Sequence, residues 1–162
     1  EDVTLPDTIR SAPMVDTQIE TDLEAYIPDE YVQVTSEKIR LYKDLTTISD
    51  EKQIEALRRE MEDRFGPIPE QLEELIRIVQ LKKVAQNLGF EKIILKNGVM
   101  LAYFISNSMH SYYRGDLFPA ILSAIQSLGD RCRVNEVKEK LYVRVKSIPD
   151  VRQAILFLSK LI

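Results

Sequence analysis

The chain has 162 residues, of which 44% are hydrophobic and 30% are charged, so it is long enough to bury one sizeable core. A lone cysteine, Cys132, excludes an internal disulfide, and an apolar run such as Val99–Ile105 is far too short to cross a bilayer, which together predict a cytoplasmic protein. The net charge of −4 is uneven, because residues 1–30 carry nine acidic side chains against Arg10 and the remainder sums to +4. A body this weakly basic argues against direct binding of DNA.

The N-terminal stretch differs in pattern from the segment that follows it. Residues 1–14 contain two prolines, scattered acids and no sustained period, which predicts an acidic flexible linker followed by a single domain over 15–162. The chain starts at Glu1 without an initiator Met, which we interpret as a fragment of a longer protein. Apolar and polar residues alternate from Val15 to Glu24 and predict a half-buried strand. Residues 28–32 then predict one helical turn.

Three helices are predicted in the rest of the first half. The first begins near Thr35 or Ser36, the second has Ser49 as its N-cap and ends at Gly66, and the third starts at Pro69 and ends before Gly89. Their predicted buried faces are Ile39, Tyr42 and Leu45 in the first, Ile54, Leu57, Met61 and Phe65 in the second, and Leu72, Leu75, Ile76, Val79, Val84 and Leu88 in the third.

The second half changes to the period of strands. Residues 90–96 and 99–105 flank Asn97 and Gly98, the pair that a type I′ hairpin turn prefers. A helix over 116–128 follows, then strands over 131–137 and 141–146, and a last helix that starts with a capping box from Ser147 to Asp150. The predicted buried residues of the two helices are Ile121, Leu122, Ile125 and Leu128, then Val151, Ile155, Leu158 and Leu161.

These elements predict an α+β fold. The order strand-strand-helix occurs twice in the second half, which predicts an antiparallel sheet built from two hairpin-helix (ββα) units with helices on one face. The helical N-terminal half is expected to pack beside this sheet.

The residues that carry catalysis in other proteins are sparse. None of the five glycines is followed by Lys-Ser or Lys-Thr, so no phosphate-binding loop is present, and one Cys with one His cannot complete a tetrahedral metal site. A small hydrolase using His110 is one alternative, but no oriented third partner is evident, and Cys132 has the setting of a small core residue. We therefore predict no catalytic residue, no cofactor and no metal.

A second alternative is a nucleic-acid-binding module. Tyr112, Tyr113 and Arg114 form an aromatic and basic cluster that could stack on bases and clamp a phosphate. The competing interpretation is that this cluster anchors a loop on the sheet.

Three blocks resemble the C-terminal domain of the bacterial transcription-repair coupling factor (Mfd). Residues 60–69, EMEDRFGPIP, resemble its Glu-x-x-Asp-Arg-Phe-Gly-x-x-Pro signature, and residues 25–31, AYIPDEY, resemble its A-x-I-P-x-x-Y block. Residues 38–43, KIRLYK, resemble its R-L-x-x-Y-K block, with Lys38 and Ile39 where Arg and Leu are usual. The resemblance runs from about residue 19 to the end, and past residue 90 it depends on the hairpin-helix pattern alone.

The resemblance implies the last domain of an ATP-dependent DNA translocase that releases stalled RNA polymerase and recruits nucleotide excision repair. In that family this domain docks on a UvrB-like N-terminal module of the same chain and covers the surface that binds UvrA. Most of the signature has a structural explanation in the helix end and the turn after it, which leaves Glu60, Asp63 and Arg64 as candidate partner-binding residues. The position of Glu60 is expected to pair with arginine on the UvrB-like module.

Overall fold

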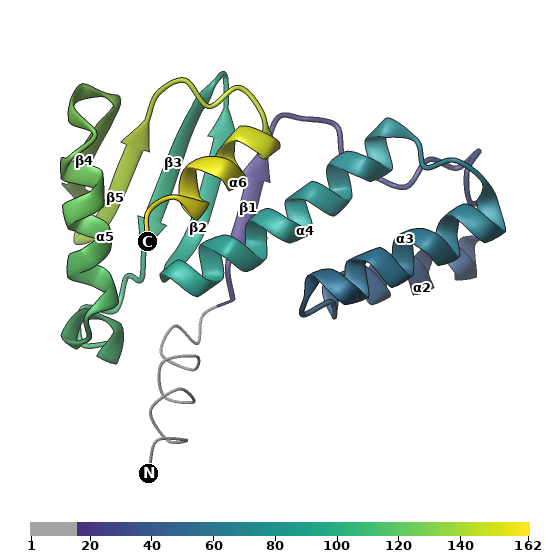
Figure 1. Ribbon diagram of the computed structural model, residues 1–162, viewed down its shortest axis with the longest axis horizontal. Helices are drawn as coiled ribbons and strands as arrows, with labels where there is room; N and C mark the ends of the chain where they lie inside the picture. The colour runs from purple at the N-terminus through teal and green to yellow at the C-terminus, as the bar shows by residue number, and fades with distance from the viewer. Residues whose placement is uncertain (1–15) are drawn as a thin grey trace, which may run out of the picture. The chain divides into compact units, whose positions relative to one another are not determined.

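The computed structural model describes residues 16–162, and these divide into two compact units (Figure 1). We call Leu23–Gln80 the helical unit, and the described residues up to Asp22 together with Leu81–Ile162 the sheet unit. Helix α4, Glu70–Leu88, contributes to both. The α+β class is confirmed, because the described residues form five α-helices and one five-stranded sheet. The predicted linker over 1–14 lies outside the described residues.

Helices α2, Thr35–Thr46, and α3, Glu51–Phe65, form the helical unit with the first part of α4. The predicted turn before α2 is confirmed, since the backbone N–H groups of residues 31 and 32 both donate to the carbonyl of Pro28. Ser49 was predicted as the N-cap of α3, but the N-cap is Asp50. The Asp50 carboxylate accepts from the Gln53 N–H at 2.9 Å and caps the helix, and the Gln53 side chain accepts from the N–H of Ser49, the residue before the N-cap, at 2.6 Å.

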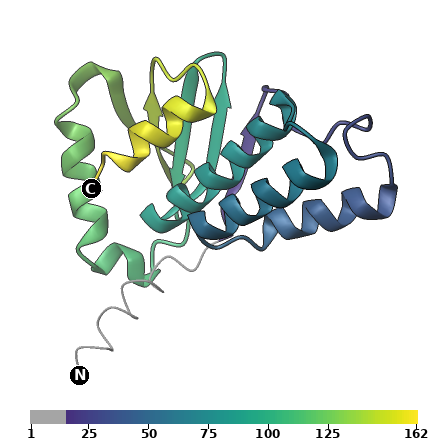
Figure 2. The ribbon, with the colours of Figure 1, turned by 45° about the vertical axis from the view of Figure 1, so that its right-hand side comes forward.

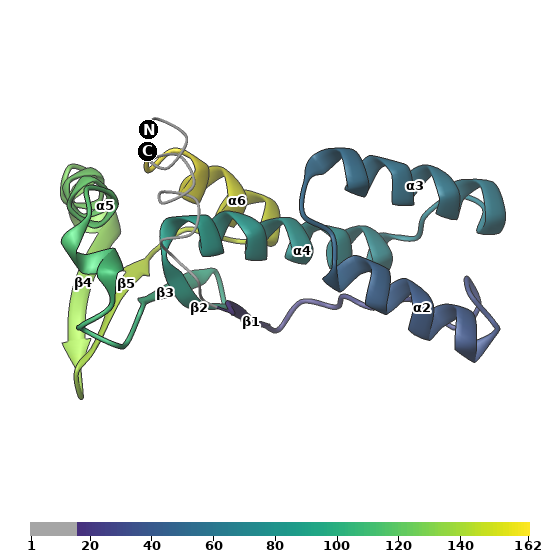
Figure 3. The ribbon, with the colours of Figure 1, turned by 90° about the horizontal axis from the view of Figure 1, so that it is seen from below.

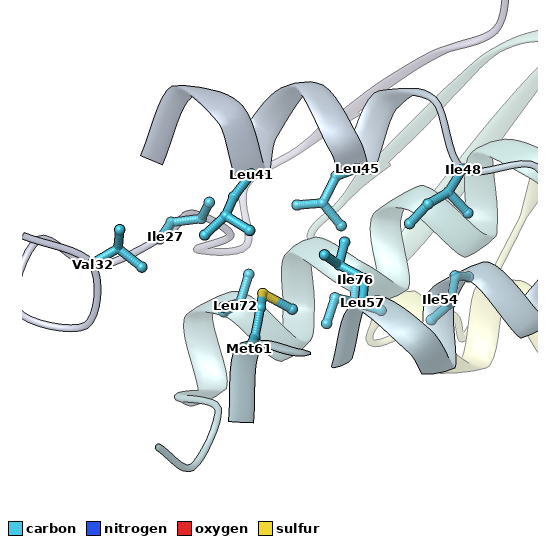
Figure 4. Packing of buried hydrophobic residues seen from close by; sticks show 10 residues of the cluster. All are labelled: Ile27, Val32, Leu41, Leu45, Ile48, Ile54, Leu57, Met61, Leu72 and Ile76. Carbon is cyan, nitrogen blue, oxygen red and sulfur yellow. The ribbon is translucent and has the colours of Figure 1, made fainter. Parts of the chain in front are cut away.

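The three helices of this unit lie side by side around one apolar cluster (Figure 2). The predicted face of α2 is wrong at two positions, because Ile39 is 58% exposed and Tyr42 is 37% exposed. Leu41 and Leu45, one turn apart, point into the cluster instead (Figure 4). Tyr42 stays at the edge because its hydroxyl accepts a hydrogen bond from the Ile27 N–H at 2.9 Å. The ten buried members are Ile27, Val32, Leu41, Leu45, Ile48, Ile54, Leu57, Met61, Leu72 and Ile76.

The sheet has the strand order β1-β2-β3-β5-β4. Strands β2, Phe90–Lys96, and β3, Val99–Phe104, form the predicted hairpin, with positive φ at Asn97 and Gly98. Strands β4, Cys132–Val137, and β5, Lys140–Val145, form the second, and β5 pairs antiparallel with β3.

The first strand makes the sheet mixed. Strand β1, Gln18–Thr21, is shorter than the predicted stretch and pairs parallel with β2. Parallel neighbours need a long connection, and here the chain forms the whole helical unit between β1 and β2. The antiparallel arrangement predicted for the sheet therefore holds for the two hairpins and not for its first edge.

The described helices of the sheet unit cover only one face of the sheet (Figure 3). Helices α5, Leu117–Gln126, and α6, Val151–Ser159, lie on the same side as residues 81–88 of α4 (Figure 3). The strand side chains buried beneath them are Ile93, Leu95, Met100, Ala102, Phe104, Val143 and Val145. No described element of the sheet unit covers the opposite face (Figure 3).

Two helix ends in this unit differ from the predictions. Leu128 is 41% exposed, because α5 ends at Gln126 and the residue falls beyond the buried stripe. Asp150 caps α6 by accepting from the Gln153 N–H at 2.8 Å, whereas Ser147 lies outside regular secondary structure at φ 62 and takes no part in a capping box.

Candidate protein-docking site

The predicted docking residues lie on the last two turns of α3, and the chain holds this helix end from several sides. The Tyr31 hydroxyl donates to the Gly66 carbonyl at 2.7 Å and lies 3.2 Å from the Met61 carbonyl, and its ring packs against Phe65 at 5.6 Å between centroids. Gly66 has φ 93 and ψ −168, a conformation open essentially to glycine alone. Burial raises the pKa of Tyr31, with Glu62 adding to the shift, so the hydroxyl keeps its proton for these bonds.

Four charged side chains of α2 and α3 form a closed ring, which we call the ion ring: Glu37, Arg40, Glu60 and Arg64. Arg64 contacts Glu37 at 2.9 Å and Glu60 at 3.4 Å. Arg40 contacts Glu60 at 3.2 Å and Glu37 at 3.3 Å, and Asp44 lies against Arg40 from outside the ring at 2.9 Å. Each arginine therefore joins α2 to α3, and the ring holds the two helices in one register.

The ring perturbs the charged groups that form it. The hydrogen bond from Arg64 lowers the pKa of Glu37, burial opposes this shift, and the hydrogen bond from Arg40 adds to the lowering. Hydrogen bonds to Glu60 and then Glu37 raise the pKa of Arg40. Because these side chains are 32–44% exposed, salt and water screen the ring, and its main effect is to orient the side chains.

The structure brings two of the three predicted residues together and leaves the third apart. Glu60 and Arg64 both belong to the ion ring, and both contacts of Glu60 go to its Oε2 atom. Asp63 is exposed, does not belong to the ring, and has no ion pair or hydrogen bond among residues 16–162. Lys52, Ala56, Arg59 and Asp63 form one exposed stripe on α3 at helical spacing.

Three residues that support the site were missed by sequence reasoning. Glu37 and Arg40 belong to the ion ring, and Tyr31 anchors the helix end. Tyr31 and Arg40 fall inside the AYIPDEY and KIRLYK blocks, which are the signal that could have found them. Nothing in the sequence marks Glu37 apart from other helix acids.

The aromatic and basic cluster of the sheet unit anchors a loop. Tyr112 is 2% exposed, and its hydroxyl donates to the Leu88 carbonyl at 2.8 Å. The Tyr113 hydroxyl donates to the Ile105 carbonyl, and Arg114 donates to the Met109 carbonyl at 3.0 Å. Burial raises the pKa of both tyrosines, most strongly that of Tyr112. The Tyr112 ring is therefore closed to a stacking base, as the interpretation of a loop anchor predicts.

His110 and Cys132 occupy structural positions. The His110 Nδ1 atom accepts from the Tyr112 N–H at 3.0 Å and caps the short helix η1, Ser111–Arg114. Cys132 is half-buried on β4, and burial raises the pKa of its thiol despite the opposing charge of Arg131. Within residues 16–162, no group of three or more His, Cys, Asp or Glu side chains is placed to hold a metal ion. None of the helices described is long and apolar enough to span a bilayer.

Comparison with known families identifies the fold. The model of the TRCF domain matches residues 21–114, which include the last residue of β1, the whole helical unit and the first hairpin. The chain belongs to the TRCF domain family. A crystal structure of the C-terminal domain of transcription-repair coupling factor superposes with a TM-score of 0.74, at 20% identity, over 91% of this chain and 92% of that one. This confirms both the resemblance and the fold class.

Curated relatives are much longer than this chain. The transcription-repair-coupling factor of Staphylococcus epidermidis is 38% identical over 78 residues, which are 48% of this chain and 7% of that protein. The protein of the same name from Staphylococcus haemolyticus is 27% identical over 79% of this chain, and that from Escherichia coli is 28% identical over 71%. The matched part spans only 11% of each of these two relatives, so this TRCF domain corresponds to a small part of their length.

Proposed function

We propose that this TRCF domain is a non-catalytic regulatory domain of a cytoplasmic transcription-repair coupling factor, and that it acts as an autoinhibitory latch. It docks on the UvrB-like N-terminal module of its own parent chain and masks the surface that binds UvrA. The parent is an ATP-dependent DNA translocase that releases stalled RNA polymerase and recruits nucleotide excision repair. The domain meets UvrA and the polymerase only indirectly, through the parent.

The observation that carries this proposal is the carboxylate of Asp63, which has no partner among residues 16–162 and lies on a helix end held by several contacts. The ion ring and the Tyr31 hydroxyl hold the last turns of α3, so the backbone that carries Asp63 has a defined position within the helical unit. Glu60 adds its free Oε1 atom on the adjacent face, since both of its contacts use Oε2. Two carboxylates one turn apart suit an arginine of the partner, because its planar guanidinium can donate hydrogen bonds to both.

The latch works by shifting a population. Contacts made only in the closed state favour closure, and any ligand that binds the open state must offset them. A coupling free energy of about 1–3 kcal/mol is typical and corresponds to roughly 5- to 150-fold in affinity. This is enough to repress UvrA binding while leaving the latch reversible.

The test reverses the charge of Asp63 in the intact factor. Asp63→Lys places a cation opposite the arginine of the partner, and we expect UvrA affinity to rise on the order of tenfold together with basal ATP hydrolysis. Glu60→Arg should act in the same direction, but it also breaks the ion ring and would perturb α2. Asp63→Lys is therefore the cleaner variant.

A matched control is available in the same unit. Glu30→Lys makes the same charge change at an exposed acid outside α3, for which the structure shows no partner among residues 16–162. It should leave UvrA binding and ATP hydrolysis unchanged. If Asp63→Lys behaves like Glu30→Lys while the domain remains folded, the latch does not use this surface and the proposal fails.

A further inference from the structure

The uncovered face of the sheet carries side chains that the latch does not use. Strand side chains alternate between faces, so residues opposite each other in register share a face. The buried positions identify the helix-covered side, and we call the other side the open face (Figure 3). One row across it runs Lys92, Tyr103, Tyr142 and Asn135, and the next row includes Arg144 and Arg133.

The two tyrosines occupy the middle of the open face. Tyr103 and Tyr142 are paired in register on β3 and β5, and their rings stack at 4.9 Å between centroids with 30° between planes. Both are only half-buried, because no described helix of the sheet unit covers them. Aromatic pairs on an uncovered sheet surface are the usual platforms for unpaired bases.

Two arginines lie directly across from each other beside this pair. Arg133 and Arg144 are register partners on β4 and β5, both are exposed, and neither side chain has an ion pair or hydrogen bond among residues 16–162. Like charges directly opposite each other destabilise a sheet, so this arrangement costs stability unless an anion lies between them. On the open face, Glu20 lies on β1 at the far edge of the sheet and pairs with Lys92 at 3.2 Å.

We propose that the open face binds single-stranded nucleic acid. Arg133 and Arg144 neutralise neighbouring phosphates, the tyrosine pair stacks on an unpaired base, and the Asn135 amide lies in the same row to contact a base edge. A duplex keeps its bases stacked inside and cannot reach the rings. An acidic peptide would use the cations and leave the aromatic pair without a role.

This site is separate from the latch. Every residue that it uses belongs to the sheet unit, whereas Glu60, Asp63 and Arg64 belong to the helical unit. The site also differs from the 112–114 cluster, whose central ring is buried. Each proposal can therefore fail without the other.

The test measures binding of the 162-residue chain to a labelled oligothymidylate of about 20 nucleotides by fluorescence anisotropy. Binding should weaken steeply between about 50 and about 200 mM salt, and an unlabelled duplex should compete poorly. Tyr142→Ala should reduce affinity on the order of tenfold, since stacking is worth about 1–3 kcal/mol per base. Arg133→Gln and Arg144→Gln should each lower the salt slope by about 0.7.

Two further readouts separate a binding role from a structural one. Arg144→Gln should leave the melting temperature unchanged or raise it, because it removes the repulsion across β4 and β5. Arg152→Gln, the same charge change at an exposed position on α6, should keep full affinity, and so should Asp63→Lys in the helical unit.

Several results would overturn the site. Among them are no binding at the lower salt concentration, equal loss with Arg152→Gln, and equal competition by duplex. Full competition by polyglutamate, with no effect of Tyr142→Ala, would instead assign the open face to an acidic protein segment.

Discussion

In the helical unit most arginines are paired with carboxylates, whereas in the sheet unit two arginines lie opposite each other in register on neighbouring strands. Leu23–Gln80 holds fourteen acidic and eight basic side chains, and its Arg40, Arg58, Arg64 and Arg77 are all paired with acids. Residues 81–162 hold thirteen basic and six acidic side chains, and the side chains of Arg133 and Arg144 have no carboxylate partner among residues 16–162. The net charge of a unit therefore does not show which charged side chains can bind a partner, because many of them are already ion-paired within the unit.

The two units are stabilised by different contacts. The largest expected loss of stability comes from a substitution in the sheet unit, where Tyr112 packs over Gly89. Gly89 has φ 89, and a Cβ there would lie 2.2 Å from the Tyr112 ring. Gly89→Ala should destabilise the chain by about 4 kcal/mol, from backbone strain together with the clash. Urea unfolding measures this loss. Gly98→Ala, at φ 75 with no atom within 4 Å, is the control and should cost about 1–2 kcal/mol. Equal losses in the two variants would show that Tyr112 does not pack over Gly89.

A second prediction tests the apolar cluster of the helical unit. Leu41 is completely buried, and Leu41→Ala should cost about 3 kcal/mol by leaving a cavity in the cluster. Ile39→Ala removes a similar side chain from a position that is 58% exposed and should change stability by less than about 0.5 kcal/mol. Thermal or urea unfolding distinguishes the two. A larger loss at Ile39 would mean that α2 is rotated relative to the structure.

The smallest expected effect concerns the ion ring and its pH dependence. Because Arg64 lowers the pKa of Glu37 in the folded state, the pair stabilises the fold above the ordinary pKa of a carboxylate. That contribution disappears as the pH falls through the lowered value. The stability difference between the chain and Glu37→Gln should therefore shrink from about pH 7 to about pH 3. Urea midpoints across this range measure it, with Glu30→Gln as an exposed control. A pH-independent difference would show that the ring does not form in solution.

The predictions that held came from patterns with local causes. Helix α3 and the hairpin of β2 and β3 were predicted at nearly their observed bounds, because an apolar stripe and the Asn97-Gly98 turn act within a few residues. The buried face of α2 was missed because Ile39 and Leu41 are equally apolar, and only packing against α3 and α4 chooses between them.

The candidate site was predicted only in part. The signature located the end of α3 and pointed to Glu60, Asp63 and Arg64, but it ranked Glu60 first. The structure shows that Glu60 already has two arginine partners and that Asp63 has none among the described residues. One of these partners, Arg64, is four residues further along α3, but the other, Arg40, comes from α2, about twenty residues earlier in the chain, and no local pattern predicts that contact.

The sequence alone determined the class of fold, the family resemblance, the corner after Gly66 and the absence of a phosphate-binding loop, because each depends on residue types at short spacing. Only the tertiary structure decided the parallel edge strand β1, the closed ion ring and the uncovered sheet face with its two opposed arginines. These features join residues that are distant in the chain. Their formation depends on the free energy of packing whole elements together, which a local pattern does not contain.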